Sequence, residues 1–237
     1  QVADRRLERV VPGVHRPGIA VVIPTLRGRT VLIDAGANAD ARPEHLVQFG
    51  HMGTVFAEEI LGISEPEVRL LSIGEEAEKG SQLTLEAHEL LRASSLRFGG
   101  NTEGRMILEG DADIVVADGF SGNVALKTLE GTVRSLLASL RGELDSSLRG
   151  KLGGLLIRPA ARRVRDRLDP ETYGGGYLLG LRGLVVVAHG SSSRVAIANA
   201  IRLAALGVDH RVVERLQERL SPGVLASARS TTPTAGR

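Results

Sequence analysis

The 237-residue chain contains no cysteine and no tryptophan, and only 3% of its residues are aromatic. Without cysteine there is no disulfide, no thiol nucleophile and no thiolate metal ligand, which is compatible with a cytoplasmic protein. Few aromatic side chains and a net charge of only +2 argue against nucleic-acid binding. No apolar run approaches 18 residues, so we expect no transmembrane helix. Residues 1–11 are too charged for the apolar part of a signal peptide.

The residues that are abundant are aliphatic side chains and glycine, with 42% hydrophobic residues and 29 glycines. This composition suits an α/β sheet with many tight turns. Only three of the 30 basic residues are lysines. The excess of arginine has two interpretations, a GC-rich genome or the binding of anionic groups by the planar guanidinium.

Strand-length apolar runs alternate with helical patterns along the chain. This alternation predicts a parallel sheet with helices on both faces. We take residues 1–220 as a single α/β domain and residues 221–237 as a disordered tail. The predicted strands are 20–24, 30–34, 68–73, 113–118 and 184–189, and the predicted helices are 43–61, 82–93, 121–140, 193–206 and 210–220.

Residues 133–168 depart from the alternation and predict a projecting helical arm. Apolar side chains recur at helical spacing over 133–157, Pro159 is expected to break the helix, and 160–168 form a second, arginine-rich helix. One interpretation is a solvated helix pair or a dimer arm. The other is a basic amphipathic element that contacts a membrane surface or an acidic protein.

Four predicted strands end in a small or polar residue followed by glycine, in the segments IDAG, SIG, ADG and AHG. Ligands of open parallel sheets bind at the carboxyl ends of the strands. We therefore expect Asp34, Asp118 and His189 to line one edge of the sheet. Each of them alone would be read as a turn or helix-cap residue.

The segment DGFSGNVALK, residues 118–127, places a glycine-rich turn before a helix. Gly119 and Gly122 permit close backbone approach, the helix amides can receive an anion, and Lys127 adds positive charge. The pattern is neither a P-loop nor a dinucleotide fingerprint. GxSxG and HExxH are also absent, so we predict neither a nucleophilic serine nor a bound metal.

Taken together and in order, seven motifs resemble the PlsX family, the bacterial phosphate acyltransferases of phospholipid synthesis. The resemblance covers residues 16 to about 206 and implies a Rossmann-like three-layer α/β/α sandwich, related to isocitrate dehydrogenases and phosphotransacetylases. The motifs are DAGAN, HLVQFGHMGTVFAEEILGI, VRLLSIGEEAEKG, GNTEGR, GDADIVVADGFSGNVALKTLEG, YGGGYLLGLRG and VVVAHGSSSRVAIANAI.

The resemblance implies an enzyme that moves a long-chain acyl group from the thioester of acyl carrier protein to inorganic phosphate, without a cofactor. Phosphate is itself the nucleophile, which agrees with the absence of cysteine. By motif position we assign Asn101, Arg105, Asn123 and Lys127 to phosphate binding or thioester polarisation, and Glu103, Asp118 and His189 to orientation or proton handling. Substrate binding is assigned to Asp34, Asn38, Met52, Gly119, Gly122 and Gly190.

The family normally begins with a strand and two glycine-rich loops that this sequence lacks. We therefore expect a fragment or a truncated gene product in which the first βα units are missing, and activity of this chain alone is in doubt. The expected partners are acyl carrier protein, inorganic phosphate, a second copy in a homodimer and the surface of an anionic membrane. Two alternatives remain, a coenzyme A-dependent phosphate acetyl- or butyryltransferase and a non-catalytic dimer or membrane scaffold.

Overall fold

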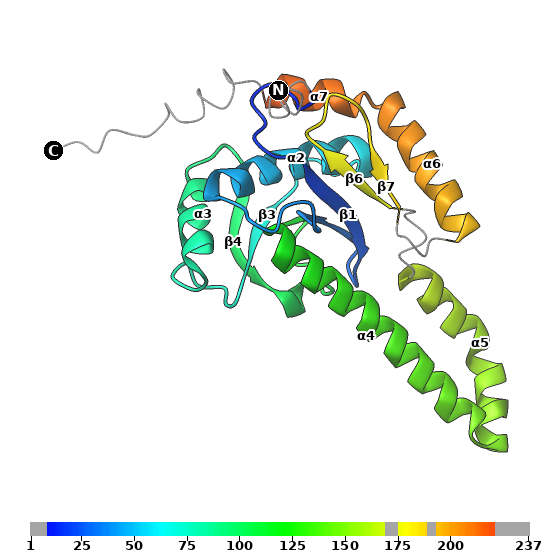
Figure 1. Cartoon of the computed structure of the whole chain (residues 1–237). Coiled ribbons are helices and arrows are strands. Elements are labelled where there is room, and N and C mark those ends of the chain that lie inside the picture. Colours follow the sequence, from blue (N-terminus) through cyan, green and yellow to red (C-terminus); the bar gives the residue numbers. More distant parts are fainter. Residues whose placement is uncertain (1–8, 169–174, 189–192, 221–237) are drawn as a thin grey trace.

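The computed structural model describes residues 9–168, 175–188 and 193–220. Seven strands form one sheet, in the order β4-β3-β5-β2-β1-β6-β7 (Figure 1). The strands are β1 (Gly18–Pro24), β2 (Arg29–Ile33), β3 (Val68–Ser72), β4 (Phe98–Glu103), β5 (Ile114–Val116), β6 (Gly176–Leu179) and β7 (Val186–Val187). The helices are α2 (Pro43–Leu61), α3 (Gln82–Arg92), the 3₁₀ turn η1 (Gly104–Met106), α4 (Gly119–Asp145), α5 (Leu148–Leu168), α6 (Arg194–Asp209) and α7 (Val212–Arg219).

The sheet is mixed, whereas the sequence predicted a parallel one. Strands β4, β3, β5 and β2 are parallel to one another, but β1 pairs antiparallel with both β2 and β6, and β6 pairs antiparallel with β7. A short turn joins β1 to β2, closed by the Thr25 amide donating to the Gly28 carbonyl, and only antiparallel strands can be joined so tightly. Strand β7 runs opposite to β2. His189 and Gly190 of the AHG segment lie outside the described residues, so their predicted place at the edge stays a prediction.

Two strands were missing from the sequence prediction. Strand β4 has the sequence FGGNTE and β6 has GYLL, and neither carries a β-branched apolar run. Glycine is depleted in strands because it has no side chain to pack, so these segments were not recognised. Pairing with β3 and β1 overrides that weak local preference.

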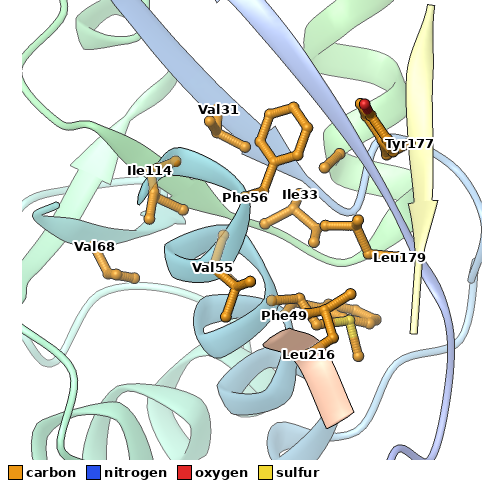
Figure 2. Packing of buried hydrophobic residues seen from close by; sticks show 14 of the residues in the cluster. Val31, Ile33, Phe49, Val55, Phe56, Val68, Ile114, Tyr177, Leu179 and Leu216 are labelled. Atoms are coloured by element: carbon orange, nitrogen blue, oxygen red, sulfur yellow. The ribbon is translucent and has the colours of Figure 1, made fainter. Parts of the chain in front are cut away.

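Helix α2 covers one face of the sheet and forms the centre of the larger core. It spans the range 43–61 that the sequence predicted. Pro43 lies in its first turn, and Gly62 ends it in the left-handed conformation. Figure 2 shows Phe49, Val55 and Phe56 of α2 among side chains of the sheet and of α7. Close approach is possible because Gly53 has no side chain, since a Cβ there would lie 2.8 Å from Cγ2 of Ile114.

Tyr177 links strand β6 to helices α2 and α6. Its ring meets Phe56 edge-on at 5.1 Å between centroids, and its hydroxyl donates to the carbonyl of Leu203 in α6. Burial raises the pKa of Tyr177 to about 12. The tyrosine therefore stays a neutral donor that fastens α6 to the sheet.

The opposite face of the sheet has a smaller core. Ile23, Leu32 and Val115 point there and pack against Ile107 and the first turns of α4, where Leu126 and Leu129 contribute. Helices α2, α3 and α7 cover the first face, so helical layers lie on both sides of the sheet, as expected for a Rossmann-like α/β/α sandwich.

Helices α4 and α5 form a hairpin that projects away from the sheet, which confirms the predicted helical arm (Figure 1). The break was predicted at Pro159, but Pro159 lies inside α5 and the chain turns at Ser146 and Ser147 instead. The Ser147 hydroxyl accepts from the Gly150 amide at 3.0 Å, so it caps the start of α5. Pro159 is tolerated because it removes one hydrogen bond from an exposed helix and breaks no packing contact with the core.

None of the described helices is both long and apolar enough to cross a bilayer. The predicted boundary between a 1–220 domain and a tail stays a prediction, because residues 221–237 lie outside the described part of the chain.

Candidate functional site

The polar segments singled out in the sequence gather at one edge of the sheet. Strands β2, β5, β3 and β4 are neighbours and parallel, so the segments that follow them emerge at the same edge. These segments contain Asp34, Asp118, Gly74 and Gly104. In sheets of this kind, the carboxyl edge is where ligands bind.

The Asp34 carboxylate is fully buried and saturated with hydrogen bonds from its own neighbourhood. Its Oδ1 accepts from the amides of Ile19, Gly36 and Ala37 at 2.9–3.0 Å. Its Oδ2 accepts at 2.8 Å from both the backbone amide and the Nδ2 of Asn38, and that Nδ2 also donates to the Pro17 carbonyl at 2.7 Å. Asp34 and Asn38 therefore shape the loop after β2 and hold it to β1.

The two glycines of α4 make room for this loop. A Cβ on Gly122 would lie 2.0 Å from the carbonyl oxygen of Asp34, and one on Gly119 would lie 2.5 Å from that of Asn38. The Gly119 amide also donates to the Asn38 carbonyl at 2.8 Å. The close backbone approach predicted for these glycines therefore brings the start of α4 against the loop after β2.

Asp118 caps α4 and occupies the amides that the sequence offered to an anion. Its Oδ1 accepts from the amides of Phe120 and Ser121 at 3.0 and 2.9 Å, and its carbonyl accepts from Gly122. Since the Gly119 amide is also bonded, the first four amides of the helix are satisfied within the chain. An anion reaches the amides of Phe120 and Ser121 only by displacing the Asp118 carboxylate, so these amides are not open to a ligand in this conformation.

Asn123 and Lys127 are exposed one turn apart on α4, so they share a face of the helix. The Asn123 side chain lies beside Gly36, where a Cβ would be 3.5 Å from its Cγ. Lys127 Nζ pairs with Glu130 Oε2 at 2.9 Å, and because the side chain is 44% exposed the pair is easily exchanged for another anion. These two side chains face solvent at the edge and are free to meet a substrate.

Arg105 forms a second polar group, after β4. Its Nε donates to Glu103 at 2.7 Å, and its NH2 lies 3.8 Å from Glu75 in the loop after β3. The hydrogen bond that Arg105 donates to the Glu103 carboxylate raises the pKa of Arg105 above its usual range, so the guanidinium keeps its charge. The side chain is 64% exposed, which leaves its other nitrogen surfaces open to solvent.

Asn101, which the sequence assigned to phosphate, is almost completely buried. Its Oδ1 lies 2.9 Å from Nδ1 of His88 in α3, and its Nδ2 donates to the Glu76 carbonyl at 2.7 Å. Both ends of the amide are used inside the protein. His88 was missed in the sequence, although a single histidine on the otherwise apolar inner face of α3 was a signal.

The remaining candidates do not join these groups. Met52 is fully buried in the core of α2, within 3.1 Å of the position a Cβ on Gly180 would take, and has no exposed surface for an acyl chain. His189 and Gly190 lie outside the described residues. Within the described ranges, no cluster of three or more histidine, aspartate or glutamate side chains is placed to hold a metal ion.

Comparison with known proteins identifies the family. A profile described as fatty acid synthesis protein matches residues 1–215. The chain is a member of this family. It is 47% identical over 213 residues to the phosphate acyltransferase of Heliobacterium modesticaldum, and 49% identical over 215 residues to that of Thermosynechococcus vestitus. These alignments cover 90% of this chain and 63% and 62% of the relatives, so the chain spans about three fifths of their length.

A solved structure supports the fold at a lower sequence similarity. The phosphotransacetylase from Streptococcus pyogenes matches with a TM-score of 0.52 and 19% identity, over 84% of this chain and 56% of that one. At this identity the likeness concerns the fold, and it agrees with the fold class that the family resemblance implied.

Among the described residues at this edge of the sheet, carboxylates outnumber cations. The acids around Arg105 and in the loops that precede the helices make the local charge of the described residues negative, which opposes the approach of an anion. The acidic side chains are Asp34, Glu75, Glu76, Glu78, Glu103 and Asp118, and the basic ones are Lys79, Arg105 and Lys127.

Proposed function

We propose that this chain forms part of an enzyme that transfers a fatty acyl group from the thioester of acyl carrier protein to inorganic phosphate. A phosphate oxygen attacks the thioester carbonyl carbon, the new C–O bond forms and the C–S bond breaks. The phosphate proton passes to the departing thiolate, so the products are an acyl phosphate and the free thiol of the carrier. Phosphate is the nucleophile, and no side chain need form a covalent intermediate.

The observation that carries this proposal is the 47–49% identity to proteins named phosphate acyltransferase over 90% of the chain. The carboxyl edge supports it, because Arg105, Asn123 and Lys127 present exposed donors there. Such donors align a dianion and stabilise the oxyanion that develops on the thioester carbonyl.

We divide the roles within the site according to the exposure of each side chain. We assign phosphate and thioester contacts to Asn123, Lys127 and Arg105, and the positioning of their loops to Asp34, Asn38 and Asp118. Glu103 orients Arg105 through its 2.7 Å hydrogen bond. His189 remains a candidate for handling the proton.

The assay is the phosphate-dependent loss of acyl carrier thioester, with acyl phosphate trapped by hydroxylamine. Asn123→Ala and Lys127→Ala are expected to lower kcat/KM by about tenfold or more, since each removes a donor used in the transition state. Arg92→Ala is the control, because Arg92 is 69% exposed in the last turn of α3, outside the site and the hairpin. Full activity of both site variants would reject this placement, and loss in Arg92→Ala would point to a general effect on folding.

A coenzyme A-dependent phosphate acyltransferase is the second candidate, favoured by the phosphotransacetylase fold of the Streptococcus pyogenes protein. The same assay with coenzyme A thioesters in place of carrier thioesters separates the two. A non-catalytic scaffold is the third, and turnover of either thioester in the presence of phosphate excludes it.

We also propose that the α4–α5 hairpin is the homodimer surface of a cytoplasmic protein that meets anionic membranes only peripherally. Large apolar side chains are exposed along α5, with Leu148, Leu152, Leu155 and Leu156 between 63% and 82% exposed. A groove of about 640 Å³ lies between the two helices. Apolar surface of this kind is stabilised by burial against a partner, and the neighbouring Arg158 and Arg162 suit anionic headgroups or the acidic carrier.

Sedimentation tests the dimer, and flotation with vesicles of phosphatidylcholine and phosphatidylglycerol tests the membrane contact. A dimer in solution that is lost in Leu152→Ser/Leu156→Ser supports the dimer surface. A monomer that floats with anionic vesicles, and not with phosphatidylcholine alone, assigns the hairpin to lipid instead.

A further inference from the structure

His88 connects the inner face of α3 to the edge of the sheet. Its side chain is buried, and its ring packs edge-on against Phe98 at 5.1 Å between centroids. Its Nδ1 lies 2.9 Å from Oδ1 of Asn101. A buried histidine with a polar partner of this kind is held in one orientation.

The contacts of Asn101 determine which atom donates. Asn101 Nδ2 donates to the Glu76 carbonyl at 2.7 Å, so the opposite atom facing His88 is the amide oxygen, an acceptor. His88 must then carry a proton on Nδ1 and donate it. If the amide were reversed, its NH2 would face that N–H and its oxygen would face a carbonyl oxygen. The Glu76 carbonyl and the His88 N–H therefore hold the asparagine together, one at each end of its amide.

The asparagine in turn holds the acidic loop between β3 and α3. The Glu76 carbonyl is bound by Asn101, and the Lys79 carbonyl accepts from the Ser72 hydroxyl at 2.8 Å. The loop closes at Gly80, which has φ +125° and no room for a side chain, since a Cβ would lie 2.2 Å from Oγ1 of Thr84. Two hydrogen bonds and one glycine thus set the path of this loop.

The last contact in this series is between the loop and the guanidinium of Arg105. Glu75, next to Glu76, brings its carboxylate to 3.8 Å from Arg105 NH2, while Glu103 holds Nε from the other side. We propose that His88 is a positioning residue which, through Asn101 and the loop 74–80, fixes the direction in which Arg105 presents its charge. The catalytic part of this inference rests on the proposed function, in which Arg105 contacts phosphate.

Two substitutions isolate the hydrogen bond from the packing. His88→Asn replaces Nδ1–H with an amide N–H at a similar position, and His88→Leu keeps a similar size without a donor. Leu91→Ala is the matched control, because Leu91 is fully buried on the same helix and its side chain is not bonded to Asn101.

The first measurement is amide hydrogen exchange of residues 73–80, compared with that of α3. His88→Leu is expected to speed exchange in the loop by about fivefold or more, and His88→Asn is expected to stay within about twofold of the parent chain. Leu91→Ala should loosen α3 and leave the loop unchanged. Unchanged loop exchange in His88→Leu, or equal effects of Leu and Asn, overturns the proposed positioning.

The second measurement separates KM for phosphate from kcat. His88→Leu is expected to raise KM by about threefold or more with kcat within about twofold, and this effect should vanish in an Arg105→Ala background because the two residues act through one contact chain. A further rise in that background overturns the link to Arg105. If the parent chain itself forms no acyl phosphate, the proposed function fails, while hydrogen exchange still decides whether His88 holds the loop.

Discussion

Helix α2 and the α4–α5 hairpin are both amphipathic, and they use their apolar faces in opposite ways. In α2, the side chains of Phe49, Met52 and Phe56 are at most 1% exposed, because they pack against the sheet. In the hairpin, Leu136, Leu148 and Leu156 are 67–82% exposed. The first helix has glycines that allow contact with the strands, whereas the hairpin leaves the sheet after its first turns (Figure 1).

The difference separates stability from interaction. Burying a phenylalanine under the sheet contributes roughly 1.5–3 kcal/mol, so α2 stabilises the fold. Exposed leucines contribute nothing comparable within the chain, and their apolar surface is available to a partner. Substitutions in the two regions should therefore affect different measurements.

The largest effect is expected from truncating the core of α2. Phe56→Ala should lower the free energy of unfolding by about 3–5 kcal/mol, because it opens a cavity beside Tyr177. Leu156→Ala, at 81% exposed, should stay within about 0.5 kcal/mol. Chemical denaturation of both variants checks the contrast, and similar losses would show that the hairpin is part of the cooperative core.

Acid is expected to lower the free energy of unfolding through a histidine in α2, whereas the hairpin contains no histidine. Burial, with a smaller contribution from Arg219, lowers the pKa of His51 to about 4. The unfolded chain binds this proton near pH 6.5 and the folded chain does not, so stability is lost as pH falls from about 6.5 to 4. The loss is on the order of 3 kcal/mol. A stability curve that is equally steep in His51→Gln would contradict this cause.

Glycines within α4 should respond according to where they lie. Gly122→Ala forces a Cβ to within 2.0 Å of the Asp34 carbonyl and should cost about 1–3 kcal/mol. Gly131→Ala meets no atom within 4 Å and should stabilise the helix by about 0.5–1 kcal/mol. Thermal unfolding of the pair tests whether the transition from core to free hairpin falls between these positions. If both substitutions destabilise the protein, Gly131 packs against another segment and does not lie on the free part of the hairpin.

The smallest effect is expected at the turn of the hairpin. Ser147→Ala removes the acceptor for the Gly150 amide and should cost about 0.5–1 kcal/mol locally, because it uncaps α5. Ser147→Asp keeps an acceptor and serves as the control. Hydrogen exchange should rise at the start of α5 and stay unchanged in α2, and a rise in α2 would couple two regions that we describe as independent.

The sequence predicted those features that have a local physical cause. Pro43 and Gly62 mark the ends of α2, and the residues after β2 and β5 do meet at one edge. The antiparallel directions of β1 and β6 depend on tertiary pairing, which no local pattern reports. Within the hairpin, Ser147 carried a capping signal that the more conspicuous Pro159 concealed.

The candidate site could be located from sequence more readily than it could be understood. Motif order placed Asp34, Asn101 and Asp118 at the edge, but their hydrogen bonds turn inward and hold loops. Whether a polar side chain faces a ligand or a backbone amide depends on the packing of distant segments. His88 was overlooked for the same reason, because its partner is 13 residues away on another element.

The projecting hairpin also offers a position for a single spectroscopic label. Gly142 is exposed on α4 near the turn, and a side chain there meets no atom within 4 Å. Because the chain has no native cysteine, Gly142→Cys supplies a single attachment point for a spin label or fluorophore. Distances between labels on two copies, or the polarity around one label beside vesicles, would then report directly what the hairpin touches.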